Sequence, residues 1–264
     1  MKKFRLFTIL ITIGLLLNCA KDNDNLTPEG IDRSANLLAT GDSANDILSN
    51  TVYSSLLIEV AFVTGFRPTV ETMNNLESYL RNRTFKNDIQ VEYREIASPN
   101  EETLTLQEIA DLESENRTAY NNGETLAIYI FFADAPSDSD DEEEGIVTLG
   151  AVYRNTSMVI HETEVRKLAN QSSLITISDV ETSTLNHEFG HLFGLVDLGT
   201  AMVNPHEDPD TENHCDIAGC LMRAELQFGG GIMAVLEKSK LSKGVAVPPL
   251  DAECILDLQN NGGR

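Results

Sequence analysis

The chain of 264 residues predicts an α/β (α+β) fold, in which a twisted, mostly parallel sheet is covered by helices. Strand-like and helix-like segments alternate along its first half, as expected for parallel strands joined by helices. The segment TLAIYIFFA, residues 125–133, is a continuous apolar run. Such a run fits a central strand that is buried on both faces.

The remaining elements follow from local patterns. Residues 54–65 are apolar and β-branched, as in a buried strand, and residues 88–96 alternate like a second strand. Pro68 and Thr69 open a helix whose apolar positions recur at helical spacing. Further elements are expected at about 104–114 (helix), 146–153 and 157–160 (strands), 179–194 (helix) and 251–259 (helix, before the stop signal NNGG).

The composition is globular and strongly acidic. There are 42 Asp and Glu residues against 19 Lys and Arg, which gives a formal net charge of −23. A surface of this sign is repelled by phosphate backbones, so nucleic-acid binding is not expected. The length suits one domain with a substantial core, and we expect a monomer.

The N-terminus resembles a bacterial lipoprotein signal. Basic residues precede an apolar stretch of about 12 residues, too short to span a membrane, which ends in LLNC. We predict a signal peptide at 1–18, lipidation of Cys19, a flexible linker at 19–45 and a catalytic domain at 46–264. The chain is then held at the membrane of the bacterial cell envelope by its lipid anchor, on the outer membrane and on either its periplasmic or its surface-exposed face.

The stretch HEFGHLFGLVD, residues 187–197, carries the candidate chemistry. On a helix that starts near Asp179, after a capping pair formed by Ser178 and Glu181, His187 and His191 stand one turn apart on one face. Their imidazoles can therefore share one metal ion. Glu188 lies about 100° around the helix from His187, within reach of a water at that ion.

Two residues extend this pattern beyond the histidine pair. Gly194 lies where the helix must stop and turn, and glycine accepts the left-handed backbone that such a turn requires. Asp197 follows six residues after His191 and can offer a carboxylate to the same ion. Zinc suits such a donor set because it takes nitrogen and oxygen ligands.

HEFGHLFGLVD resembles the HExxHxxGxx(H/D) motif of the metzincin metallopeptidases, and its aspartate form looks most like that of snapalysin. The resemblance implies a zincin-like fold with an active-site helix and a small C-terminal subdomain whose methionine turn is supplied by Met222 in HCDIAGCLM. It also implies one catalytic Zn²⁺ held by His187, His191 and Asp197. Glu188 is then the general base in the hydrolysis of a protein or peptide substrate.

The third ligand and the function each have alternatives. In most metzincins the third ligand is a histidine. The loop before Met222 offers His214 as the first alternative to Asp197 and His206 as the second. The alternative to a zinc endopeptidase is a cell-surface binding lipoprotein with a structural or inactive metal site.

Three cysteines remain besides Cys19. In an exported protein a disulfide is reasonable, and Cys215 with Cys220 is one candidate pair that would staple the loop before Met222. Pairing of either with Cys254 would instead pin the C-terminal helix. A zinc site made by these thiols is the lesser alternative, because their spacing lacks a CxxC pair.

Overall fold

The computed structural model describes residues 32–141, 143, 146–227 and 231–264. The predicted signal peptide, Cys19 and most of the predicted linker lie outside this part of the chain. Among the described residues, no helix is both long enough and apolar enough to span a bilayer.

Five strands form one mixed sheet in the order β2-β1-β3-β5-β4. All neighbouring pairs are parallel except β4 and β5, which are antiparallel. The strands are β1 (Ser55–Val63), β2 (Asp88–Ile96), β3 (Thr125–Ala133), β4 (Gly150–Arg154) and β5 (Ser157–His161). The predicted strands are thus confirmed, and β3 is central, as its apolar run requires. β4 begins later than predicted because Ile146 instead forms an isolated bridge with Asp141.

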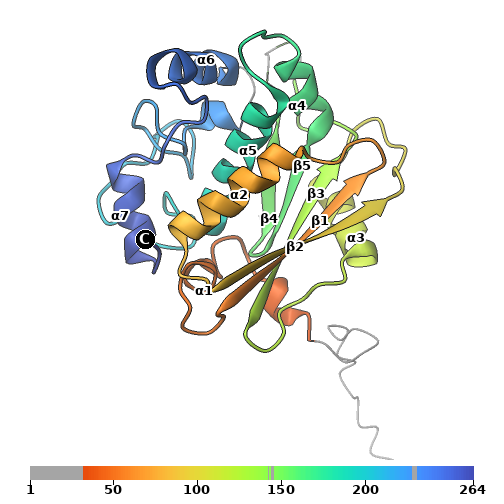
Figure 1. Ribbon diagram of the computed structural model, residues 1–264, viewed down its shortest axis with the longest axis vertical. Coiled ribbons are helices and arrows are strands. Elements are labelled where there is room, and N and C mark those ends of the chain that lie inside the picture. The colour runs from red at the N-terminus through yellow and green to blue at the C-terminus, as the bar shows by residue number, and fades with distance from the viewer. Residues whose placement is uncertain (1–31, 142, 144–145, 228–230) are drawn as a thin grey trace, which may run out of the picture.

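Helices cover both faces of the sheet (Figure 1). They are α1 (Ala44–Leu48), α2 (Val70–Arg83), α3 (Leu106–Asn116), α4 (Glu162–Ala169), α5 (Ile177–Leu192), α6 (Ile232–Lys243) and α7 (Ala252–Asn260), with 3-10 turns η1 (Ser34–Asn36) and η2 (Ala224–Leu226). The predictions did not include α1, α4 and α6.

Alternate residues of the strands enter two separate cores. On one face, residues such as Ile58 and Ile128 pack with α2, α4 and α5, and this larger core continues into the C-terminal helices. On the other face, Phe131 and Val159 pack with Ile109 of α3. The period of two along a strand produces this division. Helix α5 therefore lies between the sheet and the helices α6 and α7 (Figure 1).

Helix α5 starts two residues earlier than its sequence suggests. Its capping box is formed by Thr176 and Asp179 rather than by Ser178 and Glu181, although both pairs have the required spacing. The carboxylate of Glu181 is engaged by α2 instead, where it accepts hydrogen bonds from the backbone N–H and the hydroxyl of Thr69, at 3.1 and 2.8 Å. This tertiary contact removes Glu181 from the local cap.

The described part of the predicted linker, residues 32–45, packs against the domain. Asn36 is fully buried, and its amide donates to the carbonyl of Ala127 at 3.0 Å and to Asn121 Oδ1 at 2.8 Å. Residues 32–45 therefore pack with the domain, because the buried Asn36 is hydrogen-bonded to Ala127 of β3.

Candidate metal centre

Two histidines of α5 bring their ring nitrogens together in the interior. His187 Nε2 and His191 Nε2 are 3.1 Å apart, and both side chains are buried. The Nδ1–H of His187 donates to the carbonyl of Leu221 at 2.8 Å, which leaves the lone pair on Nε2. Burial lowers the pKa of His187 to about 3, so its imidazole is neutral, the form that binds metals.

His214 completes this cluster from the loop that follows α5. Its ring lies 5.3 Å from the ring of His187 and 5.2 Å from that of His191, between centroids. One ligand nitrogen from each of the three histidines lies within 4.8 Å of the other two. His214 Nδ1 contacts the carbonyl of Glu212 at 2.7 Å, while Nε2 lies 2.6 Å from Gln227 Oε1. A cation bound through that Nε2 must displace Gln227.

The motif spacing favours Asp197 as the third ligand, but the structure brings His214 to that place. Asp197 is exposed and is not part of the group formed by His187 and His191. After Gly194 (φ +72°) the chain continues through Val196 and Asp197, both with left-handed backbone (φ 55° and 60°). The tight turn that ends the helix thus leaves Asp197 at the surface. The resemblance to snapalysin depended on Asp197 as a ligand, and the structure does not support it.

Glu188 lies beside the three histidines as a buried carboxylate. Neither of its oxygens makes a hydrogen bond of good geometry with the described residues, and burial raises its pKa to about 8 against the opposing effect of the Val152 backbone. Gly150 of β4 makes room for it, because a β-carbon there would lie 2.9 Å from both Cγ and Oε1 of Glu188. Such a group costs free energy to bury and is typical of a site that completes its contacts with a ligand.

The segment before η2 packs beneath the α5 histidines. Met222 is fully buried, and its sulfur occupies the space that a side chain at Gly190 would need. The backbone carbonyl of Met222 accepts from the N–H of Cys215 at 2.8 Å, which closes the loop that carries His214. Met222 thus packs against the part of α5 that carries His187 and His191.

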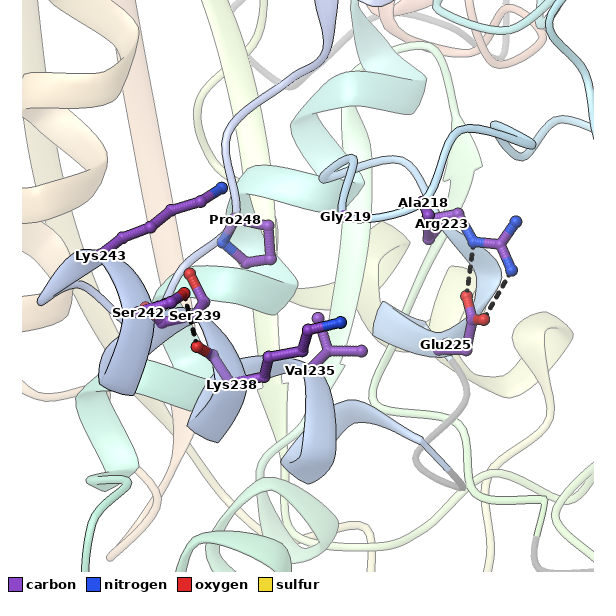
Figure 2. Close-up of a pocket in the computed structure, with 10 residues that line it drawn as sticks. All are labelled: Ala218, Gly219, Arg223, Glu225, Val235, Lys238, Ser239, Ser242, Lys243 and Pro248. Atoms are coloured by element: carbon purple, nitrogen blue, oxygen red, sulfur yellow. Dashed lines mark hydrogen bonds and ion pairs between the residues drawn. The ribbon is translucent and has the colours of Figure 1, made fainter.

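A cavity of about 230 Å³ opens at this cluster, lined by Val152, His191, Glu212, His214 and Gln227 among others. A larger cavity of about 420 Å³ lies elsewhere, between the segment around Gly219 and α6 (Figure 2). Its lining includes Lys238, Lys243 and Pro248 but none of the three clustered histidines. We place the candidate functional site at the smaller cavity. Buried imidazoles and a buried carboxylate are groups that can bind a metal and accept a proton, whereas the larger volume of the other cavity indicates no such chemistry.

His206 and the cysteines form a second group. Ligand atoms of His206, Cys215, Asp251 and Cys254 lie within 4.8 Å of one another. The expected Cys215–Cys220 disulfide is not formed, and Cys215, Cys220 and Cys254 are all free thiols. The sulfur of Cys215 instead faces His206 Nδ1 at 3.4 Å and Asp251 Oδ2 at 3.1 Å. His206 is thereby drawn away from the α5 histidines.

Comparison with known proteins finds a likeness to solved structures but not to known sequences. No protein-family model matches the sequence, and no curated protein matches it. The chain is similar to the crystal structure of archaemetzincin from Methanopyrus kandleri, with a TM-score of 0.50 and 15% identity over 79% of this chain and 96% of that chain. At this identity the likeness establishes the fold alone. The chain thus has a mixed α/β fold similar to that of archaemetzincin, which agrees in part with the fold that the motif predicted.

Proposed function

We propose that this protein is a zinc-dependent endopeptidase with one catalytic Zn²⁺ at His187, His191 and His214. The observation that carries the proposal is the convergence of three buried imidazoles beside the buried carboxylate of Glu188. A zincin-like fold supports it, since the relative's name places that protein among the metzincins.

The donor set fits zinc. Two nitrogens bound to one tetrahedral ion at 2.0–2.1 Å stand about 3.3 Å apart, and His187 Nε2 and His191 Nε2 are 3.1 Å apart. Both rings are held by the same rigid helix, and the ring of His187 is oriented from behind by the carbonyl of Leu221. Three imidazole ligands leave a fourth position for water or substrate, as catalytic zinc sites do.

The ion and Glu188 have separate roles in the proposed reaction. Bound zinc supplies Lewis acidity towards a peptide carbonyl and acidifies water. A cation at the histidines favours the ionised form of Glu188, against the burial that raises its pKa. The ionised carboxylate takes a proton from the attacking water on one of its oxygens and delivers it to the leaving amine. The space left by Gly150 lets that carboxylate move without a clash.

Strand β4 is the proposed place for an extended peptide. It is the last strand of the sheet and pairs with β5 alone among the described strands. Val152 of β4 also lines the cavity at the histidines. An unpaired sheet edge binds extended peptides by adding a strand, so a substrate along β4 would pass the metal centre.

A zinc-loaded full-length chain should cleave an unfolded protein such as casein, and a chelator should abolish the cleavage. Glu188→Gln removes the proton acceptor but keeps the shape, so activity should fall by about 10²–10⁴-fold with zinc content unchanged. Glu92→Gln, at an exposed glutamate of β2, is the matched control. Full activity in Glu188→Gln would refute the mechanism.

The contact between His214 Nε2 and Gln227 favours a second candidate, a binding lipoprotein whose metal site is inactive. In that protein the ion would be bound, but neither the unmodified chain nor any variant would hydrolyse casein. Zinc content and hydrolysis, measured on the same samples, separate the two functions.

Lipid anchoring is a separate proposal, supported by the sequence alone. The basic and apolar start of the chain and the LLNC segment motivate processing before Cys19. Mass spectrometry of the N-terminal peptide should find acyl chains on Cys19, and Cys19→Ala should release the protein from membranes. An unmodified Cys19 in membrane-bound protein would contradict this.

A further inference from the structure

The cavity of about 420 Å³ beside α6 has no role in the proposed reaction, and none of the three clustered histidines lines it. Its walls combine apolar side chains, among them Val235 and Pro248, with charged ones (Figure 2). Sites for small organic molecules have volumes of about 300–1,000 Å³ and are mostly apolar with a few polar groups. The cavity therefore has the size and the lining of a ligand site.

Two positive charges at this cavity have no counter-charge. Arg223 is paired, because its guanidinium contacts Glu225 Oε1 at 2.6 Å and Asp208 Oδ2 at 3.4 Å. Lys238 and Lys243 are exposed, and neither ammonium group forms an ion pair or a hydrogen bond with another described residue. The chain has 42 acidic residues for 19 Lys and Arg, so a shortage of carboxylates does not explain these two lysines.

The lysines belong to the last two turns of α6. Lys238, Lys240 and Lys243 all occur there, and no Asp or Glu occurs from 238 to 250. Lys240 does not line the cavity, and its Nζ instead contacts Asp179 Oδ2 at 2.7 Å. The other two reach the cavity from separate sides (Figure 2). A cation in the last turn is stabilised by the helix dipole, but the dipole does not account for two of them at one cavity.

A buried hydroxyl lies in the same wall. Ser239 is 7% exposed, and its Oγ has no hydrogen-bond partner among the described residues. The neighbouring Ser242 is satisfied, because its hydroxyl donates to the carbonyl of Lys238 at 2.7 Å. An unpaired buried polar group costs free energy, and rotation about a single bond can turn a serine hydroxyl towards a ligand.

We propose that this cavity binds an organic carboxylate with an apolar body. A carboxylate accepts hydrogen bonds from ammonium groups and hydroxyls, and Lys238, Lys243 and Ser239 supply these donors. The body packs against Val235 and Pro248. An uncharged ligand would leave both lysines without a counter-charge.

A phosphate matches the cavity less well. The planar fork of an arginine favours phosphate, but Arg223 Nε and Nη2 are both bound to Glu225, at 2.9 and 2.6 Å. Free organic acids and the C-terminal residue of a peptide both combine a carboxylate with an apolar body. The site contains none of the proposed metal ligands, so it is independent of the proposed peptidase function.

The test titrates sodium octanoate into the full-length chain by isothermal titration calorimetry. We expect one saturable site per chain, and an affinity that rises about fourfold per methylene from butanoate to octanoate as more apolar surface is buried. 1-Octanol, which lacks the charge, and acetate, which lacks the body, should each bind at least about 10-fold more weakly. Competition by N-acetylleucylleucine would name a peptide C-terminus as a source of the ligand, and its absence would name free acids.

Variants of the lining residues locate the site. Lys238→Ala/Lys243→Ala should weaken octanoate binding about 10-fold, and Ser239→Ala should weaken it about fivefold. Ser239→Ala should not lower the free energy of unfolding of the ligand-free chain, because its hydroxyl has no partner to lose. Lys167→Ala, at an exposed lysine of α4, is the matched control for a lost positive charge.

His187→Ala removes a ligand of the proposed zinc site and should leave octanoate binding unchanged. Failure of the peptidase proposal and failure of this one are therefore distinguishable. Equal binding of 1-octanol and octanoate, or unchanged octanoate binding in the double lysine variant, would overturn the proposal.

Discussion

The sulfur of Met222 lies in the space that a β-carbon on Gly190 would occupy. This contact joins the loop behind the metal centre to the middle of α5, between His187 and His191. The glycine is therefore required for close packing rather than for an unusual backbone, since it lies within a regular helix.

The first prediction concerns this contact. Gly190→Ala forces Met222 or the helix to move, and overpacking of a core costs about 1–3 kcal/mol. Denaturant unfolding should show that loss, and zinc titration should show weaker binding. The double variant Gly190→Ala/Met222→Ala should regain part of the zinc affinity, because the added methyl then has room. Additive effects in the double variant would contradict the proposed contact.

The second prediction concerns the third ligand. His214→Ala should abolish stoichiometric zinc at the α5 site, because one of three imidazoles is lost. Asp197→Ala should leave zinc content and activity unchanged, since Asp197 is exposed and separate from the cluster. Zinc analysis of the two variants and of the unmodified chain measures this difference. Loss of zinc in Asp197→Ala with retention in His214→Ala would reverse the assignment.

The third prediction concerns Gln227, whose amide oxygen lies 2.6 Å from His214 Nε2. Gln227→Ala removes a contact that competes with the cation, and a hydrogen bond contributes about 1 kcal/mol. Zinc affinity at the α5 site should therefore rise about fivefold. Gln171→Ala, at an exposed position, is the control. Weaker zinc binding in Gln227→Ala would mean that Gln227 supports the site rather than blocking it.

The fourth prediction concerns Glu162, which is fully buried in α4 and accepts a hydrogen bond from Arg166 Nε at 2.6 Å. Burial, with the nearby charge of Glu181, raises the pKa of Glu162 to about 9 from an ordinary value of 4.5. Between these two pH values the folded chain holds a proton that the unfolded chain releases. The free energy of unfolding should therefore fall as pH rises through this window, by at most about 1.4 kcal/mol per pH unit.

Glu162→Gln tests this dependence because glutamine still offers an oxygen to Arg166 and does not titrate. Unfolding measured at several pH values between 5 and 9 should show a flatter dependence for the variant than for the unmodified chain. Glu71→Gln, at an exposed residue near the start of α2, should leave the slope unchanged. Equal slopes in all three proteins would show that Glu162 is ionised in the folded state.

Local sequence patterns were sufficient to predict those strands and helices whose structure depends on a single segment of the chain. The strands β1, β2 and β3 and the helix α2 follow from apolar periodicity, and the N-terminal cap of α2 is the predicted Thr69. The helix α4 was missed because four of its eight residues, ETEVRKLA, are charged, although Glu162 and Glu164 are buried in the fold. Burial of charged residues depends on distant partners, which no local pattern contains.

For the candidate metal centre, the sequence by itself determined what one helix can determine: His187 and His191 lie on one face, and Glu188 is next to His187. Only the tertiary structure places His214, and not Asp197, with these histidines, because a left-handed turn leaves Asp197 at the surface while a loop returns His214 to the interior. It also places Cys215 and Cys254 at His206, and Cys215 forms no disulfide with Cys220 in its own loop. Spacing along a helix determines the directions in which its side chains point. The path of a loop depends instead on the parts of the fold that pack against it.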